Sequence, residues 1–162
     1  CLRDLKELGY QVGTGFMVGS PWQTMANLLE DLAFIRELQP QMIGIGPFIP
    51  HHATPFKNYP AGTLEQTLTL LSVLRLMFPK VLLPATTALG TIVPNGRELG
   101  ILAGANVVMP NLSPADVRQN YLLYDNKLCS GAEAAEAKND LAARLHSIGY
   151  EIAEGRGDYK ES

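Results

Sequence analysis

The segment 41–55 constrains the fold of this chain more than any other. It begins as a short apolar run, Gln-Met-Ile-Gly-Ile-Gly, whose length is typical of a buried parallel strand. It continues with Pro47 and Pro50, which lack the backbone N–H that a sheet requires, and then with His51 and His52. We expect a buried strand that opens into a stiff, polar loop. In α/β proteins such loops present side chains to ligands.

Helical and extended segments alternate along the rest of the chain. Apolar residues at helical spacing predict helices, and short apolar runs between turn residues predict strands. This alternation predicts an α/β protein in which four strands form one parallel sheet, in sequential order, with helices on its outer face. The expected helices cover 1–9, 25–38, 64–78, 94–103, 113–118 and 132–148, the expected strands cover 10–18, 42–49, 81–86 and 106–109, and 121–131 is expected to be irregular.

Composition limits the kinds of partner that this chain can have. Its 162 residues are enough for one domain with a sizeable core, and 46% of them are hydrophobic. The net charge of -3 gives no electrostatic reason to expect nucleic acid or an anionic membrane. No apolar run reaches the ~18 residues of a membrane span. The two cysteines do not form a disulfide framework, so a reducing cytoplasm is the default expectation.

The sequence opens in the middle of a structural element. Residues 1–9 resemble the last turns of an amphipathic helix, with Leu2, Leu5 and Leu8 on one face and Gly9 after its end. The first residue is Cys1 and not methionine. We therefore expect that further chain precedes this sequence in the natural protein.

The carboxyl ends of the expected strands carry glycines, apolar side chains and hydroxyls. Ligand chemistry gathers at these ends in parallel α/β folds. No pair of carboxylates lies there, so acid–base chemistry of the glycosidase type is not expected. The Gly13-Thr-Gly15 segment lacks the third glycine of a dinucleotide-binding fingerprint, and neither a Walker loop nor a serine nucleophile elbow is present.

Each candidate side chain at these ends also has a purely structural interpretation. His51 and His52 are adjacent and would point in opposite directions on a strand, so the two alone are not expected to form a metal site. Methionines can fill gaps in a core, and threonines can bond to nearby backbone groups. Cys129 can be a free thiol without a role. The methionines and threonines concerned are Met17, Met42, Met109, Thr86 and Thr87.

Three longer motifs in this order resemble the HydE-type radical SAM proteins, the [FeFe]-hydrogenase maturases related to biotin synthase. They are Gly-Ile-Gly-Pro-Phe-Ile-Pro-His at 44–51, Pro-Ala-Thr-Thr-Ala-Leu-Gly-Thr-Ile-Val-Pro at 84–94 and Gly-Ala-Asn-Val-Val-Met-Pro-Asn at 104–111. Residues 15–19 with Gln23 and Thr24 are similar to the segment of the family's fifth strand, and Tyr121 with Tyr124 resembles its C-terminal tyrosine pair. The resemblance runs from 1 to about 127 and includes the tail at 149–158.

This resemblance implies a fold, a set of domains and cofactors. Residues 1–131 would be the second half of a (β/α)8 TIM-type radical SAM barrel, strands five to eight, and 132–162 a C-terminal helix and tail. The whole protein would bind S-adenosyl-L-methionine (SAM) on a [4Fe–4S] cluster held by a CxxxCxxC motif, and would form a 5′-deoxyadenosyl radical that acts on a small substrate. That motif is absent here, and Cys1 and Cys129 do not replace it. We therefore expect this chain alone to bind neither cluster nor SAM and to be inactive.

The resemblance also assigns site residues, although it assigns no catalytic residue and no metal ligand. The residues assigned to SAM are Met17, Met42, Pro47 and Ile49. Those assigned to the substrate or anion pocket are Thr86, Thr87, Ala88, Met109, Tyr121 and Tyr124. An apolar interior dotted with hydroxyls agrees with radical chemistry, which must exclude water.

Two alternatives stay open at this stage. One is an enzyme like biotin synthase with a different substrate, and the other is a half barrel that binds a ligand without catalysis. The expected partners are a small-molecule substrate and the missing N-terminal half barrel. Open sheet edges at 10–18 and 106–109 also predict self-association.

Overall fold

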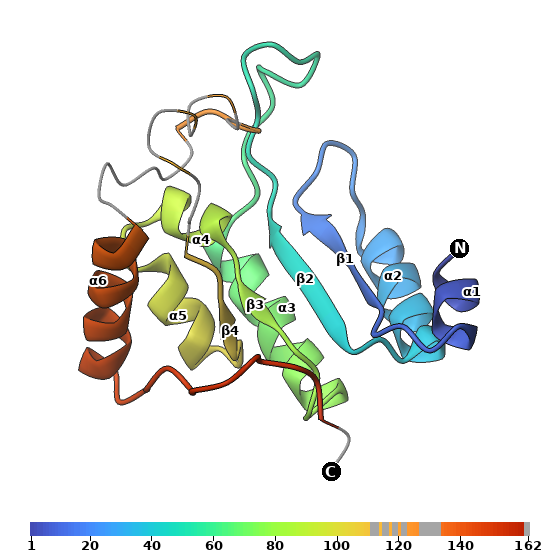
Figure 1. Ribbon diagram of the computed structural model, residues 1–162. Coiled ribbons are helices and arrows are strands. Elements are labelled where there is room, and N and C mark those ends of the chain that lie inside the picture. Colours follow the sequence, from blue (N-terminus) through green and yellow to red (C-terminus); the bar gives the residue numbers. More distant parts are fainter. Residues whose placement is uncertain (111–113, 115–116, 118–119, 121–122, 127–133, 161–162) are drawn as a thin grey trace.

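A computed structural model describes residues 1–110, 114, 117, 120, 123–126 and 134–160. Before residue 111 each strand is followed by a helix or by two, except the last strand, and a further helix precedes the C-terminal tail (Figure 1). In chain order the elements are α1 (Leu2–Glu7), β1 (Gly13–Val18), α2 (Met25–Leu38), β2 (Met42–Pro47), α3 (Leu64–Met77), β3 (Pro84–Ala85), α4 (Thr87–Ile92), α5 (Gly96–Leu102), β4 (Val107–Val108) and α6 (Ala134–Ser147).

The strands pair only in parallel within the described residues. β1 pairs with β2 from Gly13 opposite Met42 to Val18 opposite Pro47, and β3 pairs with β4. A single parallel bridge between Met42 and Leu82 connects the two pairs. The order of pairing therefore agrees with the prediction, but the structure has two two-stranded sheets joined by a bridge instead of one continuous four-stranded sheet.

The helices cover one face of these strands. α2 packs against β1, α3 against β2 and α5 against β3 (Figure 1). Along β2, Ile43 and Ile45 are buried on the helical side, whereas Gly44 and Gly46 alternate with them and face the other way. The main core lies between strands and helices and contains Val18, Leu28, Ile35, Ile43, Ile45, Leu70, Leu71, Leu74, Phe78, Val81, Leu83 and Leu89.

A second, smaller core attaches α6. Leu141 and Leu145 of α6 pack with Ile101 and with two alanines of the β3–β4 region. Arg144 on the same helix forms an ion pair with Glu98 of α5, which is buried. No helix in the described part of the chain combines the length and the apolar composition that crossing a membrane requires.

Local sequence signals explain where the longer helices begin and end. Thr24 and Asn27 form a reciprocal capping box at the start of α2, and Gln39 ends that helix in the left-handed conformation, with a φ of 51°. Thr63 accepts a hydrogen bond from the backbone N–H of Gln66 at the start of α3. Lys6 donates to the carbonyls at the end of α2 and so joins α1 to it.

The later elements differ from the sequence-based expectation. β3 is two residues long, because Pro84 brings no N–H and Thr86, directly after the strand, is already the N-cap of helix α4. α4 itself was not expected, and α5 begins at Gly96 instead of Pro94. The helix expected at 113–118 and the irregular segment at 121–131 lie largely outside the described residues.

Candidate functional site

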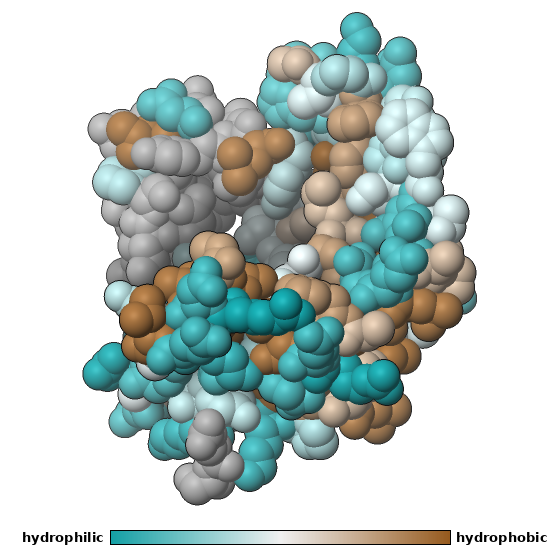
Figure 2. Space-filling view, turned by 90° about the vertical axis from the view of Figure 1, so that its right-hand side faces the viewer, coloured by the Kyte–Doolittle hydropathy of each residue, from teal (hydrophilic) through white to brown (hydrophobic). Residues whose placement is uncertain are grey.

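A large open cavity lies where the strands end. Its volume is about 860 Å³, within the range of small-molecule sites, and β1, β2, the start of α4 and the segment at 123–124 all contribute to it. In the space-filling view the molecule is hollowed on this side, with hydrophobic residues beside the hollow (Figure 2). The lining residues are Gly15, Phe16, Met17, Gly44, Ile45, Gly46, Pro47, Phe48, Ile49, His51, Thr54, Phe56, Thr86, Thr87, Ala88, Met109, Leu123 and Tyr124.

Glycines on the uncovered face of the strands make room for this cavity. Gly15 and Gly44 are register partners, and both line the cavity. A Cβ on Gly44 would meet no atom of the described residues within 4 Å, whereas a Cβ on Gly46 would lie 2.6 Å from Thr86 Oγ1. The absence of side chains thus keeps the floor of the cavity open and lets Thr86 approach β2 closely.

Aromatic side chains fix the loop that follows β2. Phe56 makes edge-to-face contacts with Phe48 and with Trp22, at ring-centroid distances of 6.3 and 5.9 Å. The loop returns at Gly62, whose N–H donates to the carbonyl of Phe48 at 2.8 Å. A Cβ on Gly62 would lie 2.0 Å from the carbonyl oxygen of Val18, so only glycine fits this return. The apolar wall formed by Phe48 and Phe56 is therefore held by packing and by backbone bonds.

Two threonine hydroxyls occupy the start of α4. Thr86 Oγ1 is buried and has no hydrogen-bond partner among the described residues, and Thr87 Oγ1 lies 3.5 Å from Nη2 of Arg97. Burial lowers the pKa of Arg97, and nearby Arg144 lowers it further, while Glu98 and Tyr124 act in the opposite direction. A buried hydroxyl without a partner and a half-buried cation beside it favour a polar or anionic group of a ligand at this end of the cavity.

The loop after β2 meets the segment at 123–126 at the edge of the cavity. The backbone N–H of His52 and its Nδ1 both donate to the carboxylate of Asp125, at 2.8 and 2.7 Å. The N–H of Asp125 in turn donates to the carbonyl of Pro50 at 3.2 Å. The side-chain hydrogen bond with His52 is the main cause that lowers the pKa of Asp125. These bonds place Leu123 and Tyr124 over the cavity.

The structure brings together most of the residues that the resemblance assigned to binding. From the SAM set, Met17, Pro47 and Ile49 line the cavity, and from the substrate set, Thr86, Thr87, Ala88, Met109 and Tyr124 line it as well. Met42 does not, because it lies at the amino end of β2, five residues and roughly 16 Å along the strand from its carboxyl end. Tyr121 lies outside the described residues.

Sequence reasoning missed several residues of this site. Arg97 and Asp125 carry no local signal, since each reaches the site from an element whose position depends on the tertiary fold. Gly15 and Gly44 stand in the first two expected strands, and neither is among the predicted site residues. Their position opposite each other could have been inferred by aligning the two expected strands in parallel.

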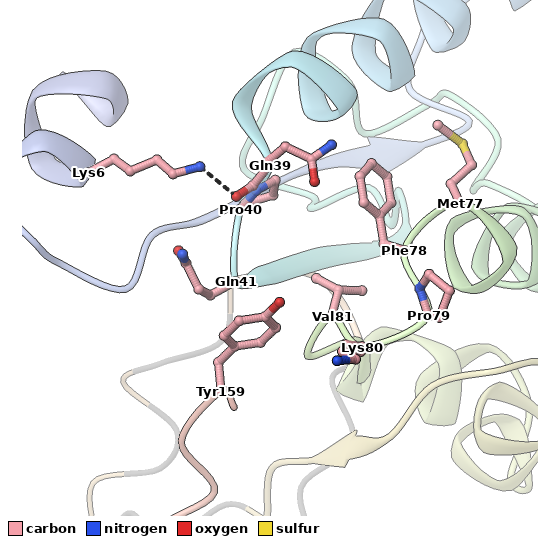
Figure 3. Close-up of a pocket in the computed structure, with 10 residues that line it drawn as sticks. All are labelled: Lys6, Gln39, Pro40, Gln41, Met77, Phe78, Pro79, Lys80, Val81 and Tyr159. Atoms are coloured by element: carbon pink, nitrogen blue, oxygen red, sulfur yellow. Dashed lines mark hydrogen bonds between the residues drawn. The ribbon is translucent and has the colours of Figure 1, made fainter. Parts of the chain in front are cut away.

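A second pocket lies at the opposite ends of the strands and has a different character. It measures about 420 Å³ and is bounded by the ends of α1, α2 and α3 and by Tyr159 of the tail (Figure 3). Lys6 reaches toward it but donates to the carbonyls of Leu38 and Gln39, at 2.6 and 2.8 Å. Lys6 thus serves the end of α2, and we regard the cavity at the carboxyl ends of the strands as the candidate site.

Comparison with known proteins places these residues in a wider context. No protein-family profile matches the sequence. Over 129 residues, or 80% of its length, the chain is 51% identical to the [FeFe] hydrogenase maturase subunit HydE of Thermotoga maritima. It is 33% identical over 126 residues to the 3-methylornithine synthase of Methanosarcina barkeri, and 28% identical over 151 residues to that of Methanosarcina acetivorans.

The matched segments cover only part of each relative. They span 37% of the HydE protein and 35% and 41% of the two synthases, while they take up 80%, 78% and 93% of this chain. This agrees with the expected correspondence to one half of a longer protein. The comparisons therefore confirm the resemblance drawn from the motifs: this chain is related in sequence to HydE-type proteins and, more distantly, to 3-methylornithine synthase.

Proposed function

We propose that this chain is part of a radical SAM enzyme of the HydE type, a maturase of [FeFe] hydrogenase, and that it forms one half of its (β/α)8 barrel. The observation that carries the proposal is the cavity at the carboxyl ends of the strands, which is lined by eight residues that the resemblance assigns to SAM or substrate. The one-sided helical cover supports it, because a (β/α)8 barrel carries its helices on the outside and the inner face of β1 and β2 is uncovered here.

The proposal implies two cofactors, and the residues of this chain suit SAM but not the [4Fe–4S] cluster. Cys1 is exposed and precedes α1, and the sequence contains no CxxxCxxC motif, so this chain lacks the cysteine set that would hold a [4Fe–4S] cluster. The cavity walls at Met17, Pro47 and Ile49 suit the organic parts of SAM, which are apolar over the adenine face. When bound to a reduced cluster, SAM supplies a 5′-deoxyadenosyl radical.

The chain's own residues would bind and orient the substrate. The hydroxyls of Thr86 and Thr87 can donate to a polar or anionic group, with Arg97 as a nearby positive charge. Met109 and Ala88 contribute apolar wall. Leu123 and Tyr124 lie over the opening and would exclude water from the reacting groups.

A complementation experiment with the whole protein that contains this sequence tests the proposal. A host that produces [FeFe] hydrogenase but lacks HydE should regain hydrogenase activity. Release of 5′-deoxyadenosine from SAM by the reconstituted protein, without restored hydrogenase activity, would instead support a relative with another substrate, such as a biotin-synthase-like enzyme. Failure of both assays would overturn the proposal in favour of a ligand-binding half barrel without catalysis.

The pocket assignment has its own test in the same protein. Thr86→Val keeps the shape of the side chain and removes one buried hydroxyl, so it should reduce substrate binding by about 1–3 kcal/mol. SAM affinity should change little in this variant, whereas Met17→Ala should weaken SAM binding. Equal loss of both affinities in Thr86→Val, or loss of neither, would contradict the assignment.

This chain alone should incorporate no iron, because it lacks the CxxxCxxC motif. Stoichiometric incorporation of four iron atoms would contradict this expectation.

A further inference from the structure

Two histidines and an aspartate from distant parts of the chain meet at the mouth of the cavity. His51 and His52 follow β2, and Asp125 lies 73 positions after His52. One ligand atom from each residue, a ring nitrogen or a carboxylate oxygen, lies within 4.8 Å of the other two. His51 lines the cavity, and the rings of the two histidines stack at a centroid distance of 4.3 Å. The sequence showed only the adjacent pair, which is insufficient for a site, and the fold adds the third group.

The arrangement is close to what a small divalent ion needs. Ligands bound at about 2.0–2.2 Å in a tetrahedral site lie roughly 3.5 Å from one another, so a pair at the outer limit of 4.8 Å must approach by about 1.3 Å, and the His52–Asp125 pair must separate by about 0.8 Å. His52 is 76% exposed and Asp125 37% exposed, so rotation of their side chains can supply these shifts without repacking a core. His52 Nδ1 and Asp125 Oδ1, at 2.7 Å, are already closer than that separation.

We propose that His51, His52 and Asp125 form a binding site for a divalent transition-metal ion such as Zn²⁺. Two imidazoles and one carboxylate suit Zn²⁺, Co²⁺ or Ni²⁺, whereas Mg²⁺ and Ca²⁺ prefer sites built from oxygens. This site is independent of the proposed function, since it uses none of the residues assigned to SAM or substrate.

Binding exchanges existing bonds for metal bonds in a balanced way. Where His52 coordinates through Nδ1, the proton that this atom now donates to Asp125 moves to Nε2 of the same ring by exchange with solvent, so the ring stays a neutral imidazole. Where His51 coordinates through Nδ1, it gives up the hydrogen bond that it accepts from the N–H of Ala53 at 3.0 Å. Three protein ligands leave at least one coordination position open, and the ion would join the segment at 123–126 to the loop after β2.

Titration of the chain with ZnCl₂ by calorimetry tests this site. The experiment uses a background with Cys1→Ser and Cys129→Ser, because free thiols bind zinc by themselves. We expect one Zn²⁺ per chain, and binding at least tenfold weaker in His52→Ala and in Asp125→Asn. The matched control is His146→Ala on α6, which should bind as the background does.

A second readout separates loss of ligands from loss of folding. Saturating Zn²⁺ should raise the thermal midpoint of the background chain and of the control but not that of Asp125→Asn, and far-UV circular dichroism should show that all variants keep their helices. Co²⁺ should bind competitively with Zn²⁺. Absence of Zn²⁺ binding, unchanged affinity in both site variants, or an equal loss in the control would overturn the proposal.

Discussion

Gly15 and Gly44 face each other across the β1–β2 ladder, yet an added methyl group should have opposite effects at the two positions. A Cβ built on Gly15 would lie 1.8 Å from the carbonyl oxygen of Gly44, far inside van der Waals contact. A Cβ built on Gly44 would meet no atom within 4 Å in the part of the chain that the structure describes. Neither glycine has a positive φ, so backbone strain does not contribute to the difference.

The clash gives the magnitude of the expected effect. In Gly15→Ala the two strands must separate locally by more than about 1 Å, which combines an overpacking cost of about 1–3 kcal/mol with weakening of the neighbouring ladder hydrogen bonds, for a total near 2–4 kcal/mol. In Gly44→Ala the open space removes the clash and alanine restricts the unfolded chain. Its free energy of unfolding should therefore stay unchanged or rise by up to about 1 kcal/mol.

Urea unfolding measures this difference directly. Trp22 is the single tryptophan and contacts Phe56 and Tyr59, so its fluorescence reports the loops that surround the site. With a slope of about 2 kcal/mol per molar urea, Gly15→Ala should lower the midpoint by about 1–2 M. A midpoint for Gly15→Ala equal to or above that of Gly44→Ala would refute the reasoning from the strand geometry.

Three further predictions concern charge and surface. The hydrogen bond with His52 lowers the pKa of Asp125, so the stabilisation from this hydrogen bond should be present above pH 3.8 and be lost as the pH falls below that value. NMR resonances of His52 that stay unchanged during an acid titration would contradict this prediction. Glu98→Gln removes the buried partner of Arg144 and should cost about 1–3 kcal/mol in denaturant unfolding, against almost nothing for the exposed Glu151→Gln. The open edges of β1 and β4 should cause self-association, and a monodisperse monomer in light scattering at high concentration would argue against it.

The longer helices could be predicted from sequence because their determinants are local. The expected bounds 25–38 match α2 at both ends, since Thr24 caps its start and its buried residues recur at helical spacing. The start of α3 at Leu64 follows in the same way from Thr63. Both helices have caps whose bonding partner lies three residues away, which a sequence displays directly.

Helix α4 could not be predicted, because its stability comes from tertiary contacts. It contains two threonines and a glycine, which are poor helix formers, and its first residues read as the end of a strand. Leu89 is fully buried in the main core, and its backbone lies against Gly96, where a Cβ would be 2.0 Å from the Leu89 carbonyl oxygen. Packing thus selects a helix that intrinsic propensity does not favour, and so places Thr86 and Thr87 at the cavity.

Met42 shows what strand periodicity can and cannot predict about a binding site. Alternation puts Met42 on the same face of β2 as Gly44 and Gly46, so the sequence correctly gives its side of the sheet. Alternation does not give the position along the strand, and Met42 lies four residues, roughly 13 Å, before Gly46. At this end of the strand, opposite to the cavity, Met42 lies next to Gly13 and forms a β-bridge with Leu82. A ligand centred on Thr86 and Ile49 would have to extend down the whole strand to touch Met42, so the proposed SAM contacts are better restricted to Met17, Pro47 and Ile49.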